Sequence, residues 1–253
     1  MQIIWIASYP RSGNTWMRFF LYHYLWGQPD SSEAVANRIP DIHKTGNTLN
    51  MRGEGTLLVK THDLMDEMHW YHQQTQGFIY ILRHPKDVLL SCYNFCQMEG
   101  DAYPSLESFA EQFIRTGGVP KWHIMRADNW LRHVESWLSL KNYPHAMIRY
   151  EDMLKRPEKA FEQVLKFLGL EVDQQRLEAA IEGSSFSRMK QMEMKERNEQ
   201  GTIFTSDHSS IEKGHRFVNQ GASKQSLASL SKEMDALFNQ RFGEAMTALG
   251  YDW

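Results

Sequence analysis

The sequence predicts an α/β protein, a single domain over residues 1–253 with a central parallel β-sheet flanked by helices. Short apolar runs typical of buried strands alternate with longer runs whose apolar residues recur at helical spacing. The length suits one large domain with an ample core. Polar residues cluster where the apolar runs end, and in parallel sheets those carboxyl ends share one ligand-binding edge.

A strand, a tight loop and a helix make up residues 2–25. The apolar strand stops at Ser8, and bulky residues recur at helical spacing from Trp16. Pro10 fixes the chain as it leaves the strand, and Gly13 lets the backbone approach a ligand. The loop N–H groups and the helix N-terminus then point at one spot, which favours an anion. An ordinary strand-to-helix connection with a good cap is the alternative interpretation.

Periodicity and turn residues predict the other elements in order. In the first half they are a polar connection over 27–54 with a short helix near 32–37, a strand at 56–60, a helix at 64–74, a clearly buried strand at 78–82, and a helix from Pro85 to about Met98. The second half has helices at 105–115 and 121–140, a strand at 146–149, helices at 157–168, 173–182 and 186–196, and a last helix at 227–249 broken near Gly243. Residues 197–221 lack periodicity, and we expect them to be a mobile cover over a site.

Bulk properties exclude several classes of protein. A formal charge of −3 argues against a general nucleic-acid binder. The two cysteines, Cys92 and Cys96, have a spacing that would let them pair or bind a metal, but two ordinary thiols of a reducing cytoplasm are the favoured interpretation. The sequence shows no signal peptide and no apolar run that could span a bilayer, so a cytoplasmic protein is expected.

Common catalytic motifs are absent. The first loop lacks the G-x-x-x-x-G-K-S/T of phosphate-loop NTPases, and neither G-x-G-x-x-G nor G-x-S-x-G occurs. His69 and His72 have the spacing of a metal pair, but no carboxylate can be placed with them. A solvated helix face is the favoured interpretation, and no metal is expected.

Five motifs, in order, resemble those of sulfotransferases that use 3′-phosphoadenosine 5′-phosphosulfate (PAPS). They are YPRSGNTW at 9–16, like the family's 5′-phosphosulfate loop; KTH at 60–62; LRHPKDVLLS at 82–91, like its 3′-phosphate segment; YEDM at 150–153; and SSF with MK within 184–190, like T-S-F-x-x-M-K. One such match would be weak, but five at compatible spacing identify the chain as a member of the family.

The resemblance implies in-line transfer of a sulfuryl group from PAPS to a hydroxyl of a small-molecule acceptor, without metal. His62 would be the general base, and Lys60 would position the sulfuryl group or the acceptor. Arg11 would hold the 5′-phosphosulfate and offset charge on the bridging oxygen. Many members carry lysine there; arginine binds phosphate well but is a poor proton donor.

The resemblance also implies a set of residues that bind PAPS and the product 3′-phosphoadenosine 5′-phosphate (PAP). Backbone N–H groups of Ser12, Gly13, Asn14, Thr15 and Trp16 would bind the 5′-phosphate. The other members are Arg83 and Ser91 on the 3′-phosphate, Trp16 and Phe186 on the two faces of adenine, Tyr150 near adenine, and Arg216 with Gly221 in a loop on the 3′-phosphate. Trp16 and Phe186 are also plausible core aromatics. Residues 216–223 fit the family's R-K-G-x-x-G-x-W pattern only partly, in either of two registers.

Two other functions stay open from the sequence: a phosphate-loop kinase and a noncatalytic binder of PAP. The identity and size of the acceptor are not encoded in any motif. Tyr93 and Phe95 are candidates for an apolar acceptor pocket that residues 197–215 would close. A family dimer motif is matched only at Lys224 and Glu233, so a homodimer is left open.

Overall fold

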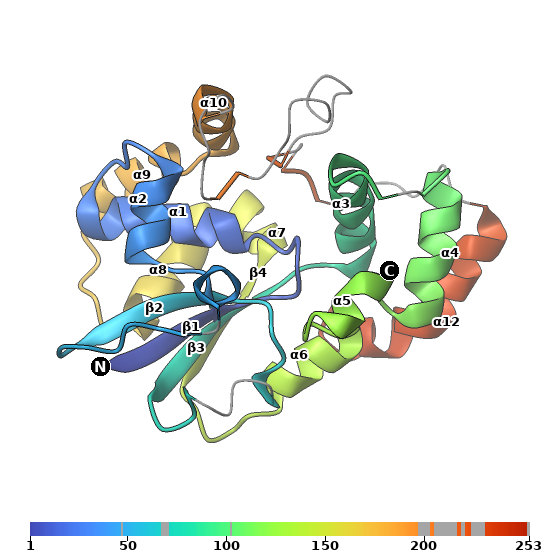
Figure 1. The fold of residues 1–253 in the computed structure, drawn as a ribbon, viewed down its shortest axis with the longest axis horizontal. Helices are drawn as coiled ribbons and strands as arrows, with labels where there is room; N and C mark the ends of the chain where they lie inside the picture. Colours follow the sequence, from blue (N-terminus) through green and yellow to red (C-terminus); the bar gives the residue numbers. More distant parts are fainter. Residues whose placement is uncertain are drawn as a thin grey trace.

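The fold is a parallel sheet between two layers of helices, as the sequence predicts (Figure 1). The computed structural model describes residues 1–46, 48–66, 71–101, 103–196, 203–204, 217–218, 221–223 and 231–251. Within these ranges the sheet order is β2-β1-β3-β4, with every pairing parallel. The strands are β1 Gln2–Ala7, β2 Thr56–Thr61, β3 Thr75–Leu82 and β4 His145–Arg149.

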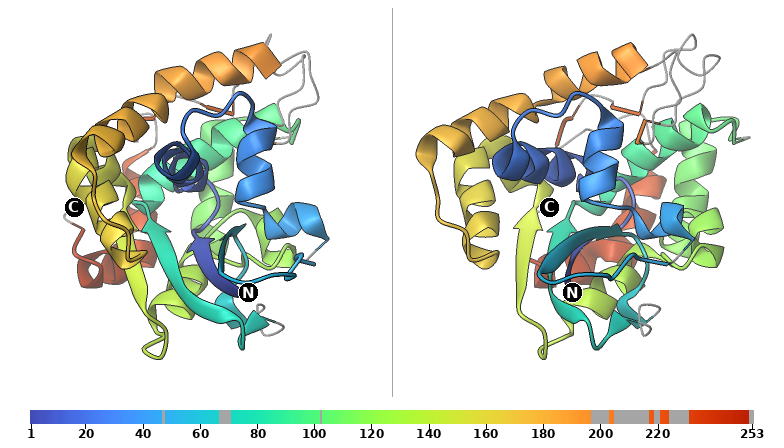
Figure 2. Two further views of the ribbon diagram at one scale, coloured as in Figure 1. Left: turned by 90° about the vertical axis from the view of Figure 1, so that its left-hand side faces the viewer. Right: turned by 60° about the vertical axis from the view of Figure 1, so that its left-hand side comes forward.

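Alternation along the strands builds two cores. Ile3 and Trp5 of β1 point into one core, and Ile4 and Ile6 point into the other. The first core is closed by α3 Pro85–Met98, α4 Leu106–Thr116, α5 Pro120–Ile124, α6 Trp130–Leu138 and α12 Lys232–Ala248. The second is closed by α1 Asn14–Trp26, α2 Ser32–Arg38, α7 Tyr150–Lys155, α8 Pro157–Phe167, α9 Gln174–Gly183 and α10 Phe186–Glu196. Figure 2 shows the sheet between these two helical layers.

The strand order creates a crevice at the carboxyl edge of the sheet. From β1 the chain moves to β2 on one side, whereas from β3 it moves to β4 on the other. The connections that leave the adjacent strands β1 and β3 therefore diverge, and ligands of open α/β sheets bind at such a switch point. A short 3₁₀ helix, η1 Ile42–Thr45, lies beside the carboxyl end of the edge strand β2.

The single helix predicted over 121–140 is wrong. The structure has α5 and α6 instead, separated by a turn in which Arg126 and Asp128 adopt left-handed backbone angles, with φ of 67° and 54°. Asn129 then caps α6 by accepting the Arg132 N–H at 2.9 Å. Short polar side chains such as Asp and Asn compete with helix continuation in this way. Met125, which the continuous apolar period would place on the inward face of that helix, is 59% exposed.

Two other element boundaries differ from the prediction. The described part of 64–74 is 3₁₀ helix and turn, residues 67–70 lie outside the described ranges, and β3 begins at Thr75. The last helix, described from Lys232 after the Ser231 cap, runs unbroken through Gly243. Gly243 is buried within this helix, and the break predicted there is wrong.

Gly77→Ala should destabilise the protein, because a Cβ on Gly77 would lie 2.5 Å from the carbonyl oxygen of Pro144. That oxygen accepts the Phe78 N–H at 3.1 Å, so relieving the clash weakens the β3–β4 junction. We expect a loss of about 1–3 kcal/mol in the free energy of unfolding, measured by urea denaturation. Gln76→Ala, at an exposed position on the same strand, is the control. Equal losses for both variants would contradict this account.

Candidate functional site

A cavity of about 450 Å³ opens at the carboxyl edge of the sheet. Its walls include most of the residues that the sequence predicts for the site: Arg11, Gly13, Asn14, Thr15, Trp16, Lys60, His62, Arg83, Ser91, Tyr150, Phe186 and Gly221. Ser12 is buried just behind the wall, and Arg216 lies outside the described residues. The structure thus brings together side chains from four strand ends and three helices.

The loop after β1 turns through two left-handed residues, Arg11 with φ of 67° and Gly13 with φ of 104°. Only glycine fits at 13, because a Cβ there would lie 2.7 Å from the Tyr150 ring. Asn14 ties the start of α1 to the strand, since its side-chain N–H donates to the Ile6 carbonyl at 2.8 Å. The loop and the first turn of α1 therefore face the cavity together.

Several buried polar atoms of this wall have no hydrogen-bond partner among the described residues. They are the Ser12 hydroxyl, the Trp16 indole N–H, the Asn14 side-chain oxygen and the Arg83 Nε. Buried polar groups are ordinarily paired with protein, water or ligand. Three of these four atoms can donate, as an anionic ligand at a helix N-terminus requires.

Two arginines converge at this wall. Arg11 donates to the Ser91 hydroxyl at 3.3 Å and to the Phe217 carbonyl at 2.8 Å, with its guanidinium 4.9 Å from the ring centres of both Phe95 and Phe217. Arg83 donates to the Arg11 carbonyl at 2.7 Å and lies 4.0 Å from the centre of the Tyr150 ring. Burial lowers the pKa of Arg11 to about 10, and Arg83 adds to this, so Arg11 stays charged near pH 7.

Trp16 and Phe186 are in direct contact, with ring centres 4.9 Å apart at 62°. A planar base between two rings needs about 7 Å, twice a van der Waals contact. Gly221 also packs against Phe186, where an added Cβ would lie 2.6 Å from the ring. The predicted sandwich of adenine between these rings therefore needs a shift of Phe186.

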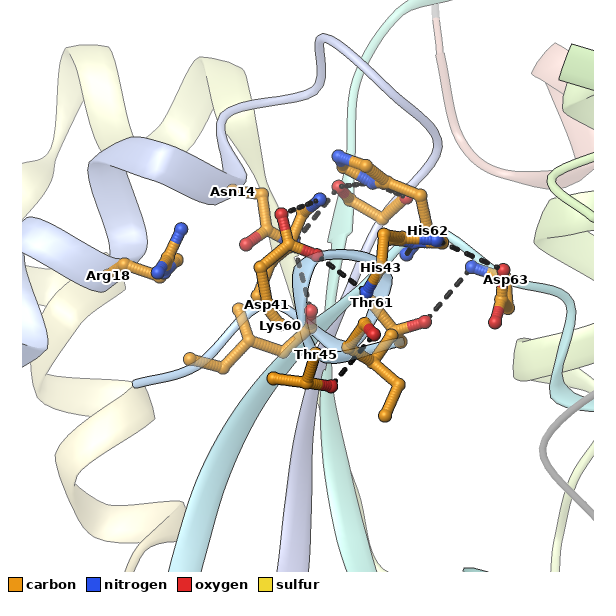
Figure 3. Close-up of polar contacts among 12 residues, drawn as sticks. Asn14, Arg18, Asp41, His43, Thr45, Lys60, Thr61, His62 and Asp63 are labelled. Atoms are coloured by element: carbon orange, nitrogen blue, oxygen red, sulfur yellow. Dashed lines mark hydrogen bonds and ion pairs between the residues drawn. The ribbon is translucent and has the colours of Figure 1, made fainter. Parts of the chain in front are cut away.

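His62 lines the cavity, and Figure 3 shows its ring among the polar contacts of the site. Its Nδ1 lies 2.7 Å from the Ser8 carbonyl, an oxygen that can only accept, so Nδ1 carries the proton and Nε2 is the basic nitrogen of the ring. Burial lowers the pKa of His62 well below 6.5, and the charges of Lys60 and His43 lower it further. His62 is therefore neutral near pH 7, as a general base must be.

Two histidines outside the sequence motifs, His43 and His133, support His62. His43 of η1 accepts the His62 backbone N–H at its Nε2, at 3.0 Å. His133 of α6 is fully buried and donates from Nε2 to the His62 carbonyl at 3.0 Å, while the Tyr80 hydroxyl lies 2.8 Å from its Nδ1. Burial lowers the pKa of His133 to about 3 and that of His43 to about 4.

Lys60 is held in an ion pair with Asp41, a residue of the predicted polar connection over 27–54. Lys60 Nζ lies 2.8 Å from Asp41 Oδ2, and the two side chains are only 11% and 12% exposed. No periodicity or motif in the sequence links Asp41 with Lys60. The one local signal is Pro40 followed by an acidic residue, which indicates a helix cap at Asp41 but not its ion pair.

Other sequence expectations have mixed outcomes. Phe95 lines the cavity, but Tyr93 packs in the first core against Phe109. Cys92 and Cys96 are free and buried. In the part of the chain that the structure describes, no three His, Cys, Asp or Glu side chains gather as a metal site, and no helix is long and apolar enough to cross a membrane. His69 lies outside that part.

The doubly wound sheet and the loop at its switch point define the class: open parallel α/β proteins whose ligand crevice lies at the carboxyl edge of the sheet. A family model described as the sulfotransferase domain matches residues 2–250. The chain belongs to the sulfotransferase family.

Relatives in sequence agree with this assignment. The chain is 28% identical over 198 residues to 3-alpha-hydroxysteroid sulfotransferase of Cavia porcellus, covering 74% of this chain and 66% of the relative. It is 30% identical over 201 residues to sulfotransferase 1E1 of Homo sapiens, covering 73% and 65%. The chain thus spans about two thirds of the length of the curated relatives that it matches.

Solved structures share the fold. Retinol dehydratase in complex with androsterone and inactive cofactor PAP superposes with a TM-score of 0.71 at 14% identity, covering 100% of this chain and 83% of that one. Mouse sulfotransferase SULT7A1 complexed with PAP also superposes with a TM-score of 0.71, at 22% identity, covering 97% and 85%.

The stability of the protein should fall on acidification because His133 is buried in its neutral form. Its pKa is about 3 in the folded chain against 6.5 for the ordinary group, so the unfolded chain binds the extra proton as the pH falls below 6.5. From pH 7 to pH 5 this one group should remove about 2 kcal/mol from the free energy of unfolding.

Urea unfolding at both pH values, for the parent and for His133→Gln, checks this. The variant should lose about 2 kcal/mol less than the parent over this interval. His72→Gln, at an exposed position, is the control and should behave as the parent does. Identical pH dependence for parent and His133→Gln would refute the assignment.

Proposed function

We propose that the protein transfers a sulfuryl group from PAPS to a hydroxyl of a small-molecule acceptor. The observation that carries the proposal is the division of one cavity into two chemically different halves. One half holds the guanidiniums of Arg11 and Arg83 beside the loop N–H groups and suits an anion. The other half holds a neutral base, His62, with the Lys60 ammonium beside it. An anionic donor and a hydroxyl acceptor match these halves.

The donor half suits PAPS. Backbone N–H groups of residues 12–16 would bind the 5′-phosphate, and Arg11 would hold the phosphosulfate. Arg83 and Ser91 would bind the 3′-phosphate, with Arg216 and Gly221 closing over it. Trp16, Phe186 and Tyr150 would surround adenine. PAP in the two related structures supports this assignment of the ligand.

The acceptor half supplies the proton chemistry. His62 Nε2 takes the hydroxyl proton of the acceptor, while Nδ1 stays fixed on the Ser8 carbonyl. Lys60 and Arg11 place positive charge beside the group that moves, and Arg11 offsets the charge left on the departing phosphate oxygen as the sulfur–oxygen bond breaks. Phe95, Trp122 and Met125 supply an apolar wall for the body of the acceptor.

The single domain and the cytoplasmic location are part of the proposal. The two continuous cores on either side of one sheet support a single domain. The free, buried thiols of Cys92 and Cys96 are typical of a reducing compartment and support the cytoplasm. A homodimer stays a hypothesis: Glu233 lies in the first turn of α12, and Lys224 is outside the described residues.

His62→Ala should abolish sulfation and leave donor binding intact. Loss of a general base lowers kcat by about 10²–10⁴-fold, whereas the donor half does not involve His62. Transfer from labelled PAPS to a panel of phenols and alcohols gives the rate, and titration with PAP gives the donor affinity. His72→Ala is the control. Activity within a few-fold of the parent would exclude His62 as the base, and turnover of ATP with Mg²⁺ but not PAPS would replace the proposal by a kinase.

Ser91→Ala should weaken the preference for a 3′-phosphate. We expect the parent to bind PAP at least about tenfold more tightly than adenosine 5′-phosphate, because charged groups contribute strongly to such contacts. In Ser91→Ala the ratio should shrink, with adenosine 5′-phosphate binding unchanged. Calorimetric titration measures both ligands, and Ser139→Ala at an exposed position is the control. Equal affinities of the parent for the two ligands would remove the role given to Arg83 and Ser91.

A further inference from the structure

We propose that Asp41 is a positioning residue that keeps the Lys60 ammonium charged and fixed at the cavity wall beside His62. The catalytic consequence of this arrangement rests on the proposed function; the coupling between the two side chains does not. Nothing in the five sequence motifs points to Asp41.

Both oxygens of the Asp41 carboxylate have defined partners (Figure 3). Oδ2 accepts from Lys60 Nζ at 2.8 Å, and Oδ1 accepts the His43 backbone N–H at 3.1 Å, which caps η1. The side chains of Asp41 and Lys60 are each about nine-tenths buried. Exposed ion pairs contribute little to stability. A buried carboxylate that accepts a hydrogen bond at each oxygen, however, restricts its partner to one position.

The backbone builds this pair into the fold. The Lys60 N–H donates to the Pro40 carbonyl at 2.8 Å, and Asp41 forms a parallel bridge with Lys60. Farther along, His43 accepts the His62 N–H. Residues 40–43 therefore run alongside the end of β2. They contact the side chain and backbone of Lys60 and the backbone N–H of His62. The parallel register of residues 40–43 along β2 therefore sets the distance between the Asp41 and Lys60 side chains.

Lys60 needs this carboxylate because its other neighbours are cationic or titratable. It faces Arg18 from α1 and Lys44 and His43 from η1, and it lies close to His62. Burial lowers the pKa of Lys60, Arg18 and Lys44 lower it further, and Asp41 opposes them by its charge and its hydrogen bond.

The carboxylate itself stays ionised. Burial alone would raise the pKa of Asp41, but Lys60, His43 and Arg18 together hold that pKa below its ordinary value.

A purely structural role for Asp41 would be to cap η1. Asparagine caps helices as well as aspartate does, so Asp41→Asn keeps the cap and removes only the charge. Asp173→Asn is the matched control, because Asp173 caps α9 in the same way, by accepting the Arg176 N–H at 2.9 Å, far from Lys60. Asp41→Glu retains the charge and gives a second test.

The first measurement does not need turnover. Lysines are methylated reductively with ¹³C-formaldehyde, and the Lys60 resonance is assigned by its loss in Lys60→Gln. In Asp41→Asn the pKa of Lys60 should fall by about 1 unit or more, while Asp173→Asn and Asp41→Glu should leave it near the parent value. An unchanged Lys60 titration in a folded Asp41→Asn would overturn the proposal.

The second measurement connects the pair to the reaction. With PAPS and an acceptor that the parent turns over, Asp41→Asn should lower kcat by about 10-fold to 100-fold, as misplaced catalytic groups do. The KM for PAPS should change less than about threefold, and the high-pH limb of kcat should move to lower pH as Lys60 loses its proton earlier. If Asp41→Asn leaves both kcat and the high-pH limb of its pH profile unchanged, the catalytic role of Asp41 is overturned. If the parent itself shows no turnover, that result counts against the proposed function alone.

Discussion

The tight left-handed turn at the end of β1 is the constraint on which the rest of the site depends. Gly13 has no Cβ, so Tyr150 can pack against its backbone, and the turn brings the Arg11 carbonyl to Arg83 and the Gly13 carbonyl to the first turn of α1. Any side chain at 13 would push β1, β3 and α7 apart at the point where they meet. The position of both guanidiniums follows from this one close contact.

The site concentrates buried ionisable groups, and this has opposite effects on function and stability. Arg11, Lys60 and the histidines lie in an environment with little water, where in the proposed reaction a fixed charge would affect a reacting group far more than it would in bulk solvent. The same burial holds His62 and His133 neutral, and unfolding releases that constraint on acidification. The buried histidines of the site therefore lower the free energy of unfolding as the pH falls.

The fold and half of the site could be predicted because the relevant signals are local. Strands, their polar ends and the glycine of the first turn all appear within a few residues of sequence. Asp41, His43 and His133 could not be predicted, because their contacts with Lys60 and His62 arise from the register of residues 40–43 along β2 and from the packing of α6. The break between α5 and α6 was missed because two left-handed residues override an apolar period that continues through them.

The position of the two halves in the sheet explains why they use different kinds of support. The proposed donor half is built on β1 and β3, which are central strands hydrogen-bonded on both sides. The proposed acceptor half is built on the end of β2, an edge strand among the described residues, and residues 40–43 run along its outer side. Lys60 and His62 are therefore only as well ordered as η1 and its preceding turn. We expect substitutions in that segment to change the proposed acceptor chemistry while the proposed donor half, supported by the central strands, stays the same.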